Sequence, residues 1–243
     1  MEFDHDLWPQ IVAHPWKFRL RDPQTINLIQ LHATRSGRTW LGGNPWTMSD
    51  ELQSARSWFA SATNRVPGAP HEAAMCNVLV GDGTLTRVLP GDMAPHHSIG
   101  HADATGLSIE ICQPLDSVPF LAVDLELAAA VCAEWSEKYG IPIKVLPFLN
   151  GDNREAPGYV RHDRSAQGRR VGKTDPGSQF PTDSEWEAMG RGEDDMALAE
   201  ENRKRMNHAA VLQMLAAKAL AGATASAGEQ ALGHGVINAM KTK

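Results

Sequence analysis

Apolar positions along the chain follow two periods, one typical of strands and one typical of helices. Runs that are apolar throughout, or at every second position, predict strands. The turn Gly81-Asp82-Gly83 between two such runs predicts a hairpin, because this turn chemistry favours positive φ angles. The predicted strands cover 26–32, 74–80, 84–89, 107–112 and 143–147.

Two segments have apolar residues at helical spacing and carry boundary signals. The first predicts a helix over 49–62, where Thr47 and Asp50 form a capping-box pattern. The second predicts a helix over 124–139, which Gly140 ends. Both helices lie between predicted strands, as expected of an α/β chain.

The order of the elements predicts one mixed α/β domain, with a central mixed β-sheet flanked by helices, over 25–190. Residues 1–24 read as an irregular N-terminal lead-in. The stretch 148–185 has little periodicity and predicts a long loop of the kind that carries function. Residues 191–243 predict a helical C-terminal segment of unknown role, with an amphipathic helix at 196–220.

Charge and hydropathy exclude some partners. The formal net charge is -6, and nucleic-acid binding without sequence preference needs basic surface, so a nucleic-acid partner is not expected. No apolar run reaches the roughly 20 residues that span a bilayer, so no membrane partner is expected. The N-terminus MEFDHDLWPQ lacks the basic start and apolar core of a signal peptide, which predicts synthesis in the cytoplasm.

Three cysteines, Cys76, Cys112 and Cys132, lie in apolar stretches. An odd, small number at such positions predicts reduced thiols in the core rather than a disulfide framework. They show no Cys-x-x-Cys spacing, which argues against a thiolate metal site.

Three polar residues are candidates for metal chemistry. His32 ends an apolar strand, His162 lies in GYVRHDRS, and Asp175 lies in GKTDPGSQF. Two imidazoles and a carboxylate, with the fourth position left for water, are a donor set for catalytic zinc. Spacing does not decide the matter, because a histidine at a strand end is often structural and an aspartate before proline is common in turns.

The strings LHATRSG, GLSIEIC and GKTDPGSQFP, in this order, resemble those of the type 2 N-acetylmuramoyl-L-alanine amidase family. The resemblance covers roughly residues 24–186, and KTDPG followed by Phe-Pro is its most specific part. That family shares its fold with the peptidoglycan recognition proteins. It includes phage endolysins and bacterial amidases that recycle wall fragments.

The resemblance implies a role for five residues. His32, His162 and Asp175 match the zinc ligands, Glu110 matches the catalytic carboxylate, and Lys173 matches a lysine two residues before the last ligand. Zinc would activate a water, Glu110 would carry its proton, and Lys173 would stabilise negative charge on the intermediate. From the alternation of its strand alone, Glu110 would instead face solvent.

Three further residues are candidates for substrate contact. His97, in APHHSIGHADATG, is the best match to an active-site histidine, and His96 is nearly as good. A second metal site of these two with His101 is an alternative, as is an exposed histidine-containing loop. Trp46 could stack on a sugar ring or pack its loop onto the core, and Arg164 could bind substrate or be solvated.

The resemblance therefore predicts a Zn²⁺-dependent amidase whose partner is bacterial peptidoglycan. We expect a phage endolysin that lyses the host cell wall and reaches it after holin-dependent release. The alternatives are a cytoplasmic amidase that recycles muropeptides, a zinc amidase acting on another acylated amine, and a non-catalytic peptidoglycan-binding module. Silent relatives usually lose a ligand, whereas this chain keeps a candidate for each role.

Overall fold

The computed structural model describes residues 18–35, 37, 46–61, 75–95, 104–147, 157–170 and 172–192. The predicted helix at 196–220 and the histidines His96, His97 and His101 lie outside these residues. In chain order the elements are β1 (Phe18–Leu20), η2 (Pro23–Thr25), β2 (Leu28–Ala33), α2 (Met48–Ala60), β3 (Val78–Gly81), β4 (Thr84–Arg87), β5 (Met93–Pro95), β6 (Gly106–Ile111), α4 (Ala122–Tyr139), β7 (Gly158–Arg161), η3 (His162–Arg164), α5 (Ala166–Arg170) and α6 (Asp183–Arg191).

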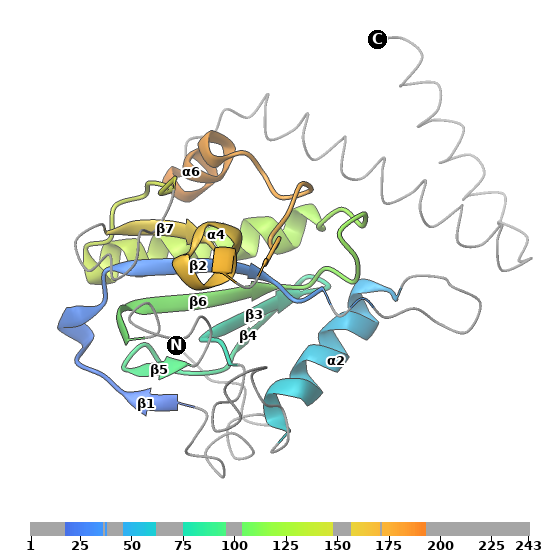
Figure 1. Cartoon of the computed structure of the whole chain (residues 1–243), viewed down its shortest axis with the longest axis horizontal. Helices are drawn as coiled ribbons and strands as arrows, with labels where there is room; N and C mark the ends of the chain where they lie inside the picture. The colour runs from blue at the N-terminus through green and yellow to red at the C-terminus, as the bar shows by residue number, and fades with distance from the viewer. Residues whose placement is uncertain are drawn as a thin grey trace, which may run out of the picture.

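A mixed sheet runs through the centre of the described part of the molecule, with strand order β4-β3-β6-β2-β7 (Figure 1). The pairs β3–β6, β6–β2 and β2–β7 are parallel, and only the β3–β4 hairpin is antiparallel. The predicted fold class, a mixed central sheet flanked by helices, is confirmed. Because β6, β2 and β7 are parallel neighbours, their carboxyl ends meet at one edge of the sheet.

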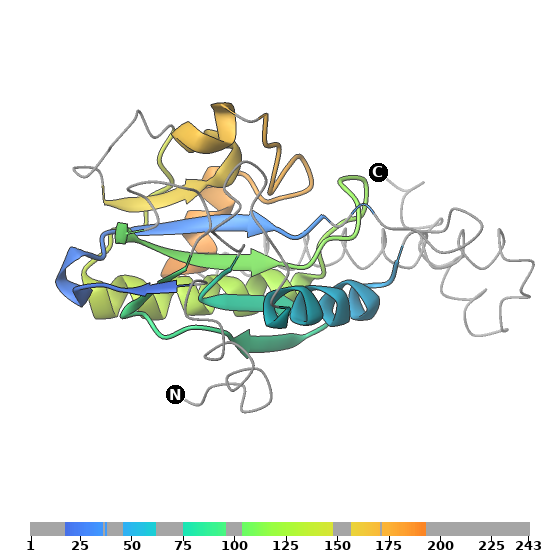
Figure 2. The ribbon, with the colours of Figure 1, turned by 60° about the horizontal axis from the view of Figure 1, so that its bottom comes forward.

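The two faces of the sheet differ in what covers them. On one face, alternate residues of the strands pack with Leu125, Val131 and Trp135 of α4, and Trp186 of α6 joins the same core cluster. Figure 2 shows α4 lying along this face. On the other face, Leu79 of β3 packs with the apolar side of α2. The helix α2 covers the β3 side of that face.

The structure contains the helix ends and the hairpin turn that the sequence predicts. Thr47 and Asp50 form a capping box at the start of α2, and Gly140 ends α4 in the left-handed conformation. In the hairpin, Gly81 pairs with Thr84, so the turn is Asp82-Gly83, and both turn residues have positive φ. Glycine and aspartate tolerate that conformation better than most residues.

Some segments differ from the sequence-based expectation. Residues 18–20 of the lead-in form β1, which pairs with β5. Residues 143–147 make a single bridge, from Val145 to Tyr159, rather than a strand. The expected loop 148–185 contains β7, η3 and α5, and α6 begins within it. The strands involved have three or four residues, too few to show a period, and they form because a neighbouring strand supplies hydrogen bonds.

Within the described residues, no helix is long and apolar enough to cross a membrane.

Candidate metal centre and active site

The candidate site lies at the sheet edge where the parallel strands end. His32 is the fifth residue of β2 and pairs with Glu110 of β6. Paired residues of neighbouring strands point to the same face, so both side chains leave the sheet on the face opposite α4. His162 follows directly after β7, the other neighbour of β2. Three adjacent strands thus deliver their polar side chains to one place.

Asp175 reaches this place from the loop that follows α5. The backbone N–H of Asp163 donates to the carbonyl oxygen of Asp175 at 2.9 Å, which ties the loop to η3. The Asp175–Pro176 peptide bond is cis. Beyond it, the Arg161 guanidinium donates to the carbonyl oxygen of Gly177 at 2.8 Å. The loop is therefore held at Asp175 by η3 and just after it, at Gly177, by the end of β7.

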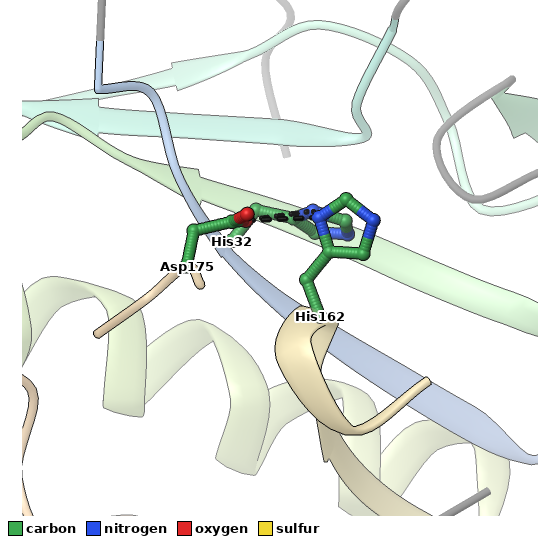
Figure 3. A group of neighbouring side chains, drawn as sticks. All are labelled: His32, His162 and Asp175. Carbon is green, nitrogen blue, oxygen red and sulfur yellow. Dashed lines mark hydrogen bonds and ion pairs between the residues drawn. The ribbon is translucent and has the colours of Figure 1, made fainter. Parts of the chain in front are cut away.

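One atom from each of the three candidate ligands points to a common centre (Figure 3). Nδ1 of His32 lies 3.0 Å from Nδ1 of His162 and 3.6 Å from Oδ2 of Asp175. Nδ1 of His162 lies 2.9 Å from the same carboxylate oxygen. All three residues are buried. The structure therefore brings together the three residues that the sequence resemblance proposed as ligands.

The charge states of two of these groups suit a cation. Burial, together with the neighbouring His162, lowers the pKa of His32 to about 4 against the opposing effect of Asp175, so the ring is neutral at pH 7. Burial acts to raise the pKa of Asp175, but the close contact with His162 Nδ1 at 2.9 Å outweighs it and holds the pKa well below its ordinary value. The centre therefore contains a neutral imidazole and an anionic carboxylate.

The tautomer of His32 also suits a cation. Its Nε2 lies 3.2 Å from the side-chain oxygen of Gln30, which is an acceptor and therefore calls for a proton on Nε2. A neutral imidazole protonated there carries its lone pair on Nδ1, the atom that faces His162 and Asp175. Metal-ligating histidines usually donate their other ring N–H in this way.

The spacing of the three atoms fits zinc. Zinc binds imidazole nitrogen and carboxylate oxygen at about 2.0–2.2 Å in tetrahedral geometry, which places ligand atoms about 3.4 Å apart. The separations of 2.9, 3.0 and 3.6 Å bracket that value. His32, His162 and Asp175 are thus a fitting three-ligand set that leaves a fourth position for water or substrate.

Glu110 lies beside this centre, with Oε1 3.9 Å from Nδ1 of His32. Its Oε2 is buried and has no hydrogen-bond partner among the described residues. Burial and the charge of Asp175 together raise the pKa of Glu110 to about 8, and Lys173 opposes them. Lys173 is exposed, and it is near enough to act electrostatically on both Glu110 and His32.

The candidates for substrate contact are not brought together in the same way. His97 lies outside the described residues, and Trp46 is half-buried just before α2. The guanidinium of Arg164 forms an ion pair with Asp183 at the start of α6, at 2.5 Å. A substrate role for these three residues stays a prediction.

Two residues near the centre were missed by sequence reasoning. Gln30 interrupts the apolar run INLIQLH two positions before His32, and a buried polar residue at that spacing was the available signal. Arg35 lies in the LHATRSG string, but its partners come from positions 113 to 174, and nothing local indicates them.

Several solved structures match the chain at low sequence identity. AmpD is 20% identical, over 72% of this chain and 89% of that one, with a TM-score of 0.46. The hydrolase AmiA from Staphylococcus aureus is 15% identical, over 71% and 77% of the two chains, with a TM-score of 0.45. The endolysin LysCS from Clostridium intestinale is 15% identical, over 73% and 90%, with a TM-score of 0.41.

A search of curated proteins found no match. A sequence model of the family described as N-acetylmuramoyl-L-alanine amidase matches residues 22–178, which is more than half of the chain and includes all three candidate ligands. The chain therefore belongs to the N-acetylmuramoyl-L-alanine amidase family and is an enzyme of that class.

Proposed function

We propose that the chain is a zinc-dependent amidase that hydrolyses the bond between N-acetylmuramic acid and the L-Ala of the peptidoglycan stem peptide. The observation that carries this proposal is the convergence of His32 Nδ1, His162 Nδ1 and Asp175 Oδ2 on one centre. The family supplies the reaction class. The three ligands could hold the metal ion, and the adjacent Glu110 could transfer the proton.

The three ligands would hold the zinc ion and leave one side of it open. When bound, zinc would polarise the amide carbonyl and activate the attacking water. Gln30 keeps the lone pair of His32 directed to the centre through the hydrogen bond at Nε2. All three ligands are buried, and the lower local dielectric strengthens electrostatic interactions between them and a bound cation.

Glu110 is the group placed to move the proton. The charge of a cation held by the three ligands would favour the ionised form of Glu110. Its carboxylate would then accept a proton from the water as the water oxygen attacks the lactyl carbonyl carbon. It would then pass that proton to the amine nitrogen of L-Ala as the carbon–nitrogen bond breaks. The ammonium of Lys173 would offer positive charge to the carbonyl oxygen while that oxygen carries the negative charge.

The test measures metal content and new amino termini on the same protein. The wild type is expected to hold about one zinc ion per chain and to release free N-terminal L-Ala from peptidoglycan. His162→Ala should lose both. Glu110→Gln should keep the zinc and lose cleavage by about 10²- to 10⁴-fold, because it removes only the proton carrier. Release of reducing sugars without new L-Ala termini would overturn the proposal.

For the biological setting we propose a phage endolysin, made in the cytoplasm and acting on the host wall after holin-dependent release. Family membership supports this setting, because the family that the chain resembles includes endolysins. The same family also includes recycling amidases. The two differ in substrate. An endolysin should clear a suspension of intact peptidoglycan sacculi, whereas a recycling amidase should cleave soluble muropeptides and leave sacculi intact.

A further inference from the structure

Arg35 lies two residues beyond β2, close to the ligand His32. Its backbone has a φ of 41°, in the left-handed region that residues other than glycine seldom adopt. Its side chain is only 14% exposed. An arginine with this backbone conformation and this burial is held by specific contacts.

The guanidinium binds the residue that immediately precedes Asp175. Nη1 of Arg35 donates to the hydroxyl of Thr174 at 2.6 Å, and Nη2 donates to the Thr174 carbonyl oxygen at 3.0 Å. Two donors of one rigid fork therefore fix both the side chain and the backbone of a single residue.

The same guanidinium is anchored on the segment that follows β6. Nε donates to the side-chain oxygen of Gln113 at 3.0 Å, and Nη2 lies 2.8 Å from the carboxylate of Asp116. Gln113 is itself fixed, because its side-chain amide donates to the carbonyl oxygen of Val118 at 2.7 Å. Arg35 thus joins the ends of two parallel strands to the loop that carries Asp175.

Gly177 shows that the loop is shaped around this contact. A Cβ at Gly177 would overlap the guanidinium of Arg35 and the carboxylate of Asp116. The φ of Gly177 is 82°, which also favours glycine. The GKTDPG string therefore presents a threonine that Arg35 binds, then the ligand, then a glycine that leaves room for the arginine.

We propose that Arg35 is a positioning residue that holds the Asp175 carboxylate in place to complete the metal site. This inference rests on the proposed zinc-dependent function. His32 lies within β2 and His162 directly follows β7, whereas Asp175 lies on a loop. The loop ligand is the one that needs a tether, and the guanidinium supplies it through Thr174.

The test compares zinc affinity in full-length variants. Arg35→Lys keeps the positive charge but cannot form the fork. Its dissociation constant for zinc should rise at least about tenfold, in the range found when groups that orient metal ligands are removed. Its Co²⁺-substituted form should show a changed visible absorption spectrum, which reports ligand geometry. Thr174→Val should raise the dissociation constant about threefold, since it removes one of the two bonds.

Arg87→Lys is the matched control. Arg87 is 15% exposed and pairs with Glu134 at 2.9 Å, so it resembles Arg35 in burial and in its ion pair but lies on the β3–β4 hairpin. The Arg87→Lys variant should have a lower thermal stability than the wild type and the same zinc affinity. In a double-mutant cycle, Arg35→Lys and Thr174→Val should be less than additive, because they remove the same contact.

A zinc affinity and a Co²⁺ spectrum like those of the wild type in Arg35→Lys would overturn the inference, and so would additive effects of Arg35→Lys and Thr174→Val. If Arg35→Lys does not fold, Thr174→Val decides alone by the same comparison. A wild type that binds no zinc would overturn the proposed function, and the inference with it. If the wild type binds zinc and Arg35→Lys binds it with the same affinity, only the inference about Arg35 is overturned.

Discussion

At the scale of single residues, His32 presents one ring nitrogen to the candidate metal centre and the other to Gln30. The contact from Nε2 to the Gln30 side-chain oxygen is 3.2 Å, and Gln30 is fully buried. Gln30→Leu removes the acceptor that selects the tautomer with its lone pair on Nδ1. We expect the zinc dissociation constant to rise by about 10- to 100-fold. Competition titration with a zinc chelator measures it.

Ser108 provides the control for that prediction. It pairs with Gln30 across β2 and β6 and points to the same face, and its hydroxyl has no hydrogen-bond partner among the described residues. Ser108→Ala should therefore keep the zinc affinity of the wild type. An equal loss of zinc affinity in Gln30→Leu and Ser108→Ala would mean that the affinity depends on the polarity of this face of the sheet and not on the hydrogen bond to His32. The ¹⁵N shifts of His32 should report the change of tautomer in Gln30→Leu alone.

The sequence identified the candidate ligands but not the residues that orient them. His32, His162, Asp175 and Glu110 stand in strings that resemble those of a known family, so resemblance found them where spacing could not. Arg35 acts through partners some 80 to 140 positions away, at Gln113 and Thr174. Contacts of that separation leave no local pattern, because the fold creates them.

At the scale of elements, the short helix α5 packs directly on the turn η3 that carries His162. A Cβ at Gly168 would overlap the carbonyl oxygen of His162, and the Ser165 hydroxyl bridges that oxygen to the N–H of Gly168. Gly168→Ala must therefore displace the backbone of a ligand. We expect a loss of about 1–3 kcal/mol in stability and weaker zinc binding, measured by denaturant unfolding and by zinc titration.

Gly91 separates the two effects in the Gly168→Ala prediction. A Cβ at Gly91 would overlap the hydroxyl of Tyr139, and this glycine lies before β5, in a different part of the fold from η3. Gly91→Ala should lower stability and leave zinc affinity unchanged. Unchanged zinc affinity in Gly168→Ala would show that η3 tolerates a shift of α5.

The β3–β4 hairpin is tied to α4 by one buried carboxylate. Asp124, in the first turn of α4, accepts from the backbone N–H of Asp82 at 3.1 Å and of Gly83 at 2.7 Å. Burial raises the pKa of Asp124 to about 6, although the two N–H donors favour the charged form. Since the folded protein favours the protonated acid, this group's contribution to stability is present below about pH 4 and is lost as pH rises through 6.

Asp124→Asn tests that linkage, because the asparagine does not titrate. The stability advantage of the wild type over the variant should be largest near pH 4. It should fall by up to about 3 kcal/mol by pH 7, the free energy that corresponds to such a pKa difference. Denaturant unfolding of both proteins across this pH range gives the difference directly. An advantage that grows with pH would contradict the assigned direction.

Elements with strong local signals were predicted from the sequence, and elements that depend on neighbours were not. The helices α2 and α4 have caps and helical spacing, and the β3–β4 hairpin has its Asp82-Gly83 turn, so each was placed to within a few residues. β1 and β7 have three and four residues, and they exist because β5 and β2 supply hydrogen bonds. Short paired strands are determined by tertiary structure.

At the scale of the whole molecule, α6 closes the described fold. Trp186 is 1% exposed and joins the core cluster shared by the sheet and α4. Its ring centroid lies 4.7 Å from that of Phe180, and Glu187 accepts from the backbone N–H of Val145 at 2.8 Å. A capping box at Thr182 starts the helix and Gly192, in the left-handed conformation, ends it. The strands that carry the ligands and the helix that backs them all precede this glycine.

Truncation on either side of α6 should therefore give opposite results. A chain that ends after Gly192 should unfold cooperatively and keep about one zinc ion, because the ligands and the core cluster lie before that point. A chain that ends at position 181 loses Trp186. It should lose about 3–5 kcal/mol, the usual effect of removing a buried tryptophan, which is a large part of the stability of a typical domain. Thermal unfolding and metal analysis of the two truncated chains distinguish these outcomes. Loss of zinc from the longer one would show that residues beyond 192 contribute to the metal centre.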